Sequence, residues 1–336
     1  MRVLIQSYDN FAQNKAGGVY SKVMNYIKSA EGSDVLMKPF DKWQDKLKDY
    51  DIIHYFGLKL EFIDQMKLAK NLGLKIVISS IITPTSISRI KTKLFLGKKT
   101  RLHSDEEKFQ CMFNMADAII TETGKEREFI ITAYGVCPGK VHIIPNGISD
   151  EILGGDPSLL KTKLGISKDF VLQVGRFDDN KNQLSVIKAM NGMDIPVVFV
   201  GGEDPAYKEY YLECKRCAQD NIYFAGWIDH SDPLMASAYA GAKVVVLPSF
   251  HEIFGNAIFE GAMAGANIVA TKVLPLEEFG FSNHSITISP DSIASIKEAI
   301  VKSYNMDRDP LFPEFVRKQY SLESVYTMHL NIYKGL

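Results

Sequence analysis

Apolar residues along the chain alternate between short uninterrupted runs and longer stretches with helical spacing. The run RVLIQS at the start predicts a buried strand, and Val19, Val23 and Ala30 after it share one face of a helix. Further strands are predicted at DIIHYFG, KIVISSIIT, ADAIITET and VHIIPNGIS. Short β-rich runs separated by helices are typical of parallel sheets covered on both faces, so this half predicts a doubly wound α/β domain.

The same alternation begins again after a polar stretch, DEILGGDPSLLKTKLGISKD, which we interpret as the segment following a domain boundary. Strands are predicted at FVLQVG, IPVVFVGG, IYFAG, AKVVVLPS, NIVAT and SITIS, and helices at NQLSVIKAM and PAYKEYYLECKRCAQ. The last 25 residues, 312–336, predict one amphipathic helix. We therefore expect a first domain over 1–148, a second over 149–319 and a final helical segment over 320–336.

Composition and charge limit the protein class. Apolar residues make up 46% of the chain and charged residues 24%, as in soluble globular proteins. The net charge of −1 divides into +5 for residues 1–150 and −6 for the remainder, which suggests different partners for the two halves. With no signal-like start, no membrane-length apolar run and four cysteines, we expect a cytoplasmic protein without a nucleic-acid partner.

The loop VGRFDDNKNQ directly follows a predicted strand, a position where open parallel sheets bind ligands. Gly175 permits a tight turn, and Arg176 and Lys181 bracket the loop before a helix. Two cations beside a helix N-terminus can neutralise a diphosphate. The alternative is a solvated loop in which both cations pair with Asp178 and Asp179.

The segment SFHEIFGNAIFEGAMAGANIVAT places two carboxylates, Glu252 and Glu260, around the start of a helix near Gly255. The second carboxylate falls among small and apolar residues, where an unpaired charge is costly. A carboxylate can accept hydrogen bonds from two adjacent sugar hydroxyls, as in dinucleotide-binding folds. The alternative is a glutamate on the helix surface.

A glycine pair, Gly17 and Gly18, lies between the first strand and the first helix and suits close approach to a phosphate. The pair lacks the G-x-G-x-x-G spacing, which argues against a dinucleotide fingerprint and hence against an oxidoreductase.

Taken together, GRFDDNKN and PSFHEIFGNAIFEGAMAGANIVAT resemble the retaining glycosyltransferases of family 4, also called group 1. Glu252 and Glu260 match the family's E-x7-E motif, and Gly175, Arg176 and Lys181 match its G-R-x4-K element. The resemblance implies a GT-B fold, in which two Rossmann-like domains face each other. It also implies that the C-terminal helix, 320–336, crosses back onto the first, acceptor-binding domain, and that the second domain binds the nucleotide sugar.

The resemblance also implies residue roles. Arg176 and Lys181 would hold the donor diphosphate, and Glu260 would bind the nucleotide ribose. Glu252 would lie beside the transferred sugar, so that Glu252, Arg176 and Lys181 form the expected catalytic set. The remaining expected donor contacts are Gly17 and Gly18 near the phosphates, Trp227 and Ile228 at the base edge, and the backbone of Phe254, Gly255 and Asn256 around the sugar.

The implied reaction moves a sugar from a nucleoside diphosphate carrier to a hydroxyl acceptor, with retention and without a metal ion or other cofactor. A UDP-sugar is the favoured donor and a GDP-sugar the alternative. The expected acceptor is a sugar, a lipid-linked molecule or a small molecule, in the assembly of a cell-surface polysaccharide or glycoconjugate. An ordinary two-carboxylate hydrolase geometry does not apply to such transfer.

One departure from the family pattern concerns the first domain. Many relatives place a histidine just after the strand that corresponds to KIVISS, whereas this chain continues IITPTS. His54, His103, Ser80 and Thr83 are the substitutes that the sequence offers. A catalytically inactive, nucleotide-sugar-binding homologue is therefore the alternative function.

Two other features carry weaker hypotheses. The segment Arg89–Arg101 has six basic residues around Leu94, Phe95 and Leu96, and it suggests peripheral contact with the inner face of a membrane or with a lipid diphosphate acceptor. The alternative is a mobile, solvated surface loop. Cys214 and Cys217 form a single C-x-x-C without further ligands, so we expect ordinary helix residues rather than a zinc site.

Overall fold

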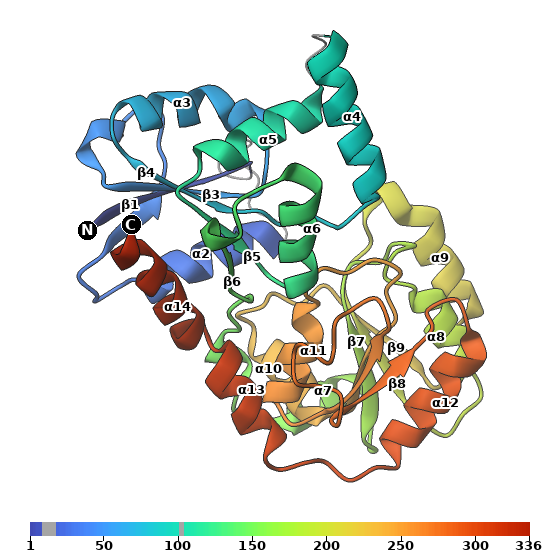
Figure 1. Cartoon of the computed structure of the whole chain (residues 1–336). Coiled ribbons are helices and arrows are strands. Elements are labelled where there is room, and N and C mark those ends of the chain that lie inside the picture. Colours follow the sequence, from blue (N-terminus) through green and yellow to red (C-terminus); the bar gives the residue numbers. More distant parts are fainter. Residues whose placement is uncertain (9–17, 101–103) are drawn as a thin grey trace. The chain divides into compact units, whose positions relative to one another are not determined.

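The computed structural model describes residues 1–8, 18–100 and 104–336, and the chain divides into two compact units (Figure 1). Unit 1 comprises Met1–Gly147 and Leu322–Leu336, and unit 2 comprises Ile148–Ser321. These limits lie within two residues of the expected boundaries. None of the helices in the described ranges is long and apolar enough to pass through a lipid bilayer.

Unit 1 contains a parallel six-stranded sheet with the order β2-β1-β3-β4-β5-β6. Its edge strand β2 was not predicted, because LMKP is short, contains Pro39 and leaves Leu36 53% exposed. The strands are β1 (Arg2–Ser7), β2 (Leu36–Pro39), β3 (Ile52–Phe56), β4 (Lys75–Ser79), β5 (Ala118–Thr121) and β6 (Val141–Ile143).

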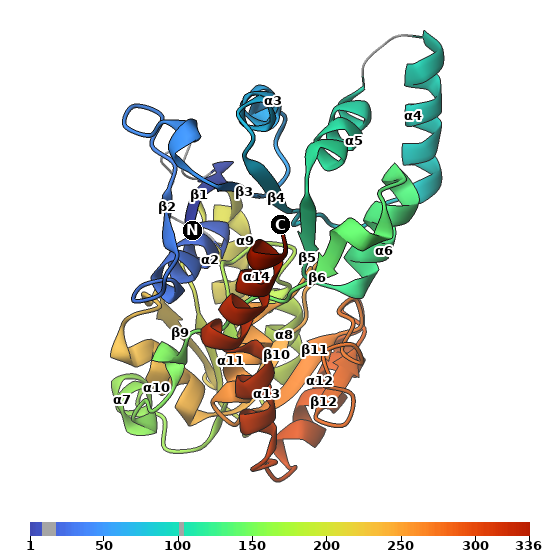
Figure 2. The same ribbon diagram turned by 60° about the vertical axis from the view of Figure 1, so that its left-hand side comes forward.

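Helices cover both faces of this sheet (Figure 2). One face packs on α2 (Gly18–Ser29) and α14 (Leu322–Gly335), and the other on α3 (Ile63–Asn71), α4 (Ile87–Thr100), α5 (Asp105–Met115) and α6 (Gly124–Tyr134). The basic segment Arg89–Arg101 is helical through residue 100, so the surface-loop alternative is wrong for its described part. Leu94 of that helix is buried, whereas Phe95 is 66% exposed.

Unit 2 contains a second parallel six-stranded sheet, in the order β12-β11-β10-β7-β8-β9. Its strands are β7 (Phe170–Val174), β8 (Val197–Val200), β9 (Ile222–Gly226), β10 (Ala242–Leu247), β11 (Asn267–Thr271) and β12 (Ser285–Ile288). One face packs on α7 (Pro157–Leu164), α10 (Pro233–Gly241), α11 (Asn256–Met263) and α13 (Phe312–Tyr320), and the other on α8 (Gln183–Met190), α9 (Lys208–Cys217) and α12 (Ile293–Tyr304). Both units are doubly wound α/β domains, as predicted.

Two local predictions are corrected by the structure. The polar stretch after the boundary contains helix α7, which Asp156 caps and Gly165 ends in a left-handed conformation, and Leu160 buries its inner face. The single C-terminal helix is two helices, because Ser321 is extended and separates α13 of unit 2 from α14 of unit 1. Cys214 and Cys217 lie on α9, as expected of ordinary helix residues.

The order of the strands in unit 2 reverses between β7 and β10, which are neighbours in the sheet although β8 and β9 separate them in the chain. Ligands in open parallel sheets bind at the carboxyl ends of the strands at such a reversal. The two loops with the candidate residues, after β7 and after β10, therefore leave the sheet side by side.

Candidate functional site

The loop after β7 approaches the loop after β8 closely. A Cβ atom on Gly201 would lie 2.0 Å from the carbonyl oxygen of Gly175, so the turn after β8 has no room for a side chain at residue 201. Arg176 follows, with 62% of its side chain exposed, and its guanidinium lies 3.2 Å from Asp178 and 3.2 Å from Asp204. Two carboxylates thus hold this cation at the surface of the loop.

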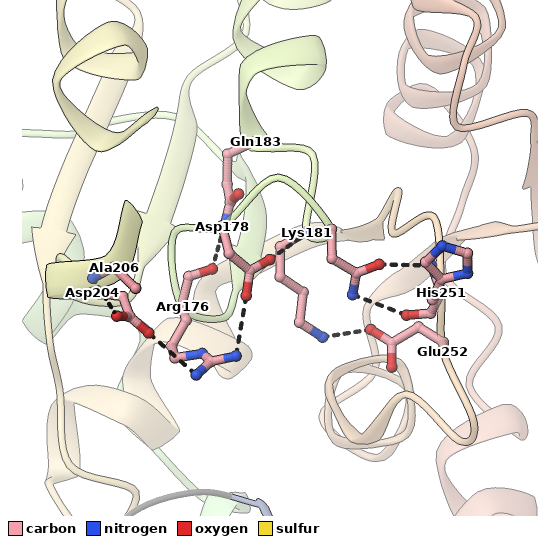
Figure 3. A network of polar contacts seen from close by, with 9 residues as sticks. Arg176, Asp178, Lys181, Gln183, Asp204, Ala206, His251 and Glu252 are labelled. Atoms are coloured by element: carbon pink, nitrogen blue, oxygen red, sulfur yellow. Dashed lines mark hydrogen bonds and ion pairs between the residues drawn. The ribbon is translucent and has the colours of Figure 1, made fainter. Parts of the chain in front are cut away.

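Lys181 joins the two loops at the sheet reversal. Its ammonium forms an ion pair with the carboxylate of Glu252, and Figure 3 shows the two side chains pointing toward each other. The backbone N–H of Lys181 donates to Asp178 over 2.8 Å. The predicted pairing of the loop cations with Asp178 and Asp179 is thus right for Arg176 with Asp178, but wrong for the Lys181 side chain.

Amide side chains fix the same two loops. The side chain of Asn180 donates to the carbonyl of His251 over 3.0 Å and accepts from its N–H over 2.8 Å. Asn182 adopts a left-handed backbone with φ 58°, and its buried amide donates to the carbonyls of Pro248 and Pro290. The bonds to His251 and Pro248 join the loop after β7 to the loop after β10, and the bond to Pro290 joins it to the loop after β12, so the backbone around the Lys181–Glu252 pair is held by side-chain amides.

Helix α11 lies unusually close to the sheet because small residues face it. A Cβ on Gly261 would lie 2.5 Å from the side chain of Val245 on β10, and Gly255, at φ 81°, gives the turn that starts the helix. Phe254 is 2% exposed and stacks on Phe259 at 4.0 Å, so its side chain belongs to the core and only its backbone is left for a ligand. Asn256 is the first residue of the helix.

Glu260 on α11 is buried, which rules out the alternative of a surface glutamate. One carboxylate oxygen accepts a hydrogen bond from the hydroxyl of Tyr239, and the other lies 3.0 Å from Nε2 of His230. These two partners were missed in the sequence, because they stand 21 and 30 residues away without local periodicity linking them to Glu260.

The predicted base-edge residues follow β9. Trp227 is 69% exposed, whereas Ile228 is 6% exposed and packs in the core of unit 2. The side chain of Ile228 is therefore engaged in packing, and its backbone is what the loop presents.

The first-unit candidates are differently placed. Gly17 and His103 lie outside the described residues, and Gly18 is the first residue of α2. His54 is fully buried, with Nδ1 2.6 Å from the hydroxyl of Tyr333 and Nε2 2.8 Å from Ser79 Oγ, so it is no substitute for the family histidine.

The other two substitutes, Ser80 and Thr83, follow β4. The buried hydroxyl of Ser80 donates to Glu126 over 2.7 Å, whereas Thr83 is exposed. Over the described ranges, no three His, Cys, Asp or Glu side chains are grouped so that they could hold a metal ion.

Family models match nearly the whole chain in two blocks. The model described as "Glycosyltransferase Family 4" matches residues 2–152, and that described as "Glycosyl transferases group 1" matches residues 168–306. The two blocks correspond to unit 1 and unit 2, respectively.

Similar proteins include an uncharacterized 41.2 kDa protein in the cps region of Klebsiella pneumoniae. It is 22% identical over 303 residues, which cover 86% of this chain and 80% of the relative. A D-inositol 3-phosphate glycosyltransferase of Kribbella flavida is 27% identical over 175 residues, which cover 47% of this chain and 41% of that enzyme. This second match therefore spans less than half of either protein.

Solved structures share the fold at low identity. A glycosyltransferase from Rickettsia africae matches with a TM-score of 0.73 and 14% identity, over 99% of this chain and 97% of the other. HepE of Anabaena, in complex with UDP and glucose, matches with a TM-score of 0.70 and 15% identity, over 100% and 99%. A sucrose-phosphate synthase from Thermosynechococcus elongatus matches with a TM-score of 0.69 and 18% identity, over 99% of this chain and 98% of the other.

Proposed function

This chain belongs to the group 1 glycosyltransferases of family 4, and we propose that it moves a sugar from a nucleoside diphosphate donor to a hydroxyl acceptor with retention. The observation that carries the proposal is the ion pair of Lys181 and Glu252 at the reversal of the unit 2 sheet. A cation and a carboxylate meet there at the edge where this fold binds ligands.

The cations are suited to a diphosphate leaving group. Arg176 offers an exposed, forked donor, and Lys181 offers a compact charge that is 25% exposed. When the bond to the sugar breaks, negative charge develops on the diphosphate, and fixed cations stabilise that charge in the transition state. We propose that these two cations serve without a metal ion and that the leaving phosphate accepts the acceptor's proton on the same face.

Glu252 is placed to act on the transferred sugar. Its side chain is 12% exposed and reaches Lys181 from the loop before α11. A carboxylate beside the cations can accept hydrogen bonds from sugar hydroxyls and orient the anomeric carbon over the diphosphate. Glu260, further along the same helix, would receive the ribose hydroxyls.

The donor and the pathway are proposed more broadly. A UDP-sugar is the preferred donor, supported by the UDP and glucose in the HepE structure, with a GDP-sugar as the alternative. The acceptor would be a sugar, a lipid-linked molecule or a small molecule. The relative from a cps region supports a role in surface polysaccharide assembly.

A second candidate function is nucleotide-sugar binding without transfer. It is favoured by one observation, namely that the family histidine is absent after β4 and that His54 is sealed in the core. A thermal-shift screen of UDP-, GDP- and ADP-sugars, followed by an assay of nucleoside diphosphate release with a panel of acceptors, separates the two. Stabilisation by a donor with release supports transfer, stabilisation without release supports the binding protein, and no stabilisation contradicts both.

A further inference from the structure

Glu260 has a donor on each of its two oxygens, and the donors come from different elements. The hydroxyl of Tyr239 on α10 donates to Oε2, while Nε2 of His230, in the loop after β9, lies 3.0 Å from Oε1. The carboxylate is thus held from both sides within unit 2.

The two donors differ in their exposure. Tyr239 is fully buried, and burial raises the pKa of its hydroxyl well above the usual value, so the phenol remains a permanent donor. His230 has 41% of its side chain exposed, against 11% for Glu260. The imidazole is therefore the more solvent-accessible of the two groups that form this contact.

A carboxylate has about four lone-pair directions, two on each oxygen. Tyr239 and His230 use one on each oxygen, which leaves one on each for a pair of neighbouring hydroxyls. We propose that His230 is a positioning residue that, together with Tyr239, fixes the Glu260 carboxylate so that its two free lone pairs meet a ribose diol. This inference rests on the proposed function, because the diol is that of the donor nucleotide.

The protonation of His230 then affects the strength of this arrangement. The hydrogen bond with Glu260 raises the pKa of His230, and the charges of Glu260, Glu151 and Asp229 add to the rise, although burial opposes it. A protonated imidazole donates from Nε2 without condition, whereas a neutral one donates only in one tautomer. The pKa of His230 lies above the ordinary histidine value of 6.5. Nucleotide affinity should therefore fall as the pH rises through this raised pKa.

The test measures UDP-glucose and GDP-mannose affinity by calorimetry between about pH 6 and pH 8.5, a range in which the diphosphate diesters do not titrate. His230→Leu removes the donor and should weaken binding about tenfold or more at low pH. His230→Gln retains an N–H donor, so it should bind within about threefold of the wild type and lose the pH dependence. His284→Gln is the matched control, since His284 pairs with Asp309 at 2.9 Å elsewhere in unit 2.

A second readout needs no nucleotide. The imidazole of His230, followed by NMR, should titrate at a lower pH in Glu260→Gln than in the wild type, and an unchanged titration would overturn the pairing. Equal donor affinity of His230→Leu and the wild type, or a persisting pH dependence in His230→Gln, would overturn the positioning role while the proposed function stands. If no donor binds the wild type but the imidazole responds to Glu260→Gln, the proposed function fails and the pairing stands.

Discussion

The two sheets are built alike, yet polar side chains at their carboxyl ends are used differently. In unit 2, Lys181 and Glu252 meet between the loops after β7 and β10 and keep 25% and 12% of their side chains exposed. In unit 1, His54 in the middle of β3 meets Ser79 at the end of β4, but both are buried and Tyr333 of α14 bonds to the imidazole. Polar groups that solvent reaches are suited to a ligand, whereas sealed ones hold a helix to a sheet.

Two buried glutamates show the same contrast. Glu126 in unit 1 accepts from the backbone N–H groups of Ile82 and Glu122 and so fixes a loop in which Ile81 has a strained φ of 48°. Burial raises the pKa of Glu126. The Glu260 carboxylate in unit 2 is held by the side chains of Tyr239 and His230, which come from two other elements. This difference favours a structural role for the first and a ligand-binding role for the second.

The most direct test of this difference between the units removes the Lys181 cation from the sheet edge of unit 2. Lys181→Ala should lower the turnover number by about 10² to 10³, because a fixed charge that stabilises the leaving diphosphate is lost. Turnover is measured as nucleoside diphosphate release with the donor found in the thermal-shift screen. Lys188→Ala, an exposed lysine on the adjoining helix α8, is the control. Turnover within threefold of the wild type would refute the assignment.

Glu252→Gln separates transfer from binding at the same site. The amide keeps the size of the side chain and can still accept from Lys181, but the carboxylate beside the sugar is gone. We expect turnover to fall about 10²-fold while UDP affinity changes by less than about threefold, because the interaction is made with the reacting sugar. The control is Glu277→Gln, which alters an exposed glutamate of unit 2. Equal losses in UDP affinity and turnover would instead make Glu252 a nucleotide contact.

Acid should destabilise unit 1 through its sealed histidines. Burial lowers the pKa of His329 to about 3 and that of His54 well below its usual value. Since the unfolded chain binds these protons near pH 6.5 and the folded unit does not, stability falls as the pH drops from about 6.5 toward 3. His329 alone should contribute about 2 kcal/mol of this loss at pH 5.

His329→Leu tests this account, because Nε2 of His329 has no hydrogen-bond partner among the described residues and leucine removes the titration. Pulse proteolysis across a urea series at pH 7 and pH 5, with cleavage sites assigned to unit 1, gives the stability difference. His142→Gln removes a less buried histidine and should flatten the pH dependence less. An unchanged acid sensitivity in His329→Leu would mean that other groups cause it.

Periodicity in the sequence was sufficient for the doubly wound domains, because a buried strand such as VVFV is a continuous apolar run and FVLQV contains a single polar residue, Gln173. It missed β2, whose edge position allows an exposed leucine, and it merged α13 with α14, since the extended Ser321 between them interrupts no apolar stripe. Both errors concern elements whose bounds depend on tertiary packing and not on the local pattern of apolar residues.

Part of the candidate site could also be predicted from the sequence, because it depends on the predicted strands. Arg176, Lys181 and Glu252 stand in loops directly after strands, so the fold alone brings them to one edge. The partners of Glu260 were not readable, because Tyr239 lies inside an apolar helix and His230 in a polar loop, and only the folded chain brings them together. The burial of His54 likewise depends on α14, nearly 280 residues later in the chain.

The smallest predicted effect concerns the surface of unit 1, where we propose that helix α4 touches an anionic membrane. Arg89 and Lys91 are exposed beside the exposed Phe95. Lys93 is already paired with Glu106, so it is the weaker candidate.

Lys91→Gln should reduce flotation with vesicles of phosphatidylglycerol and phosphatidylcholine by about fivefold at low salt, since one basic residue near such a surface contributes about 1 kcal/mol. The control is Lys75→Gln, which removes an equal charge from the first residue of β4, whereas α4 follows the last residue of that strand; this change should leave flotation unchanged. Wild-type flotation that is the same with pure phosphatidylcholine, or equal losses in the two variants, would leave the exposed cations of unit 1 as ordinary solvated charges, unlike those at the sheet edge of unit 2.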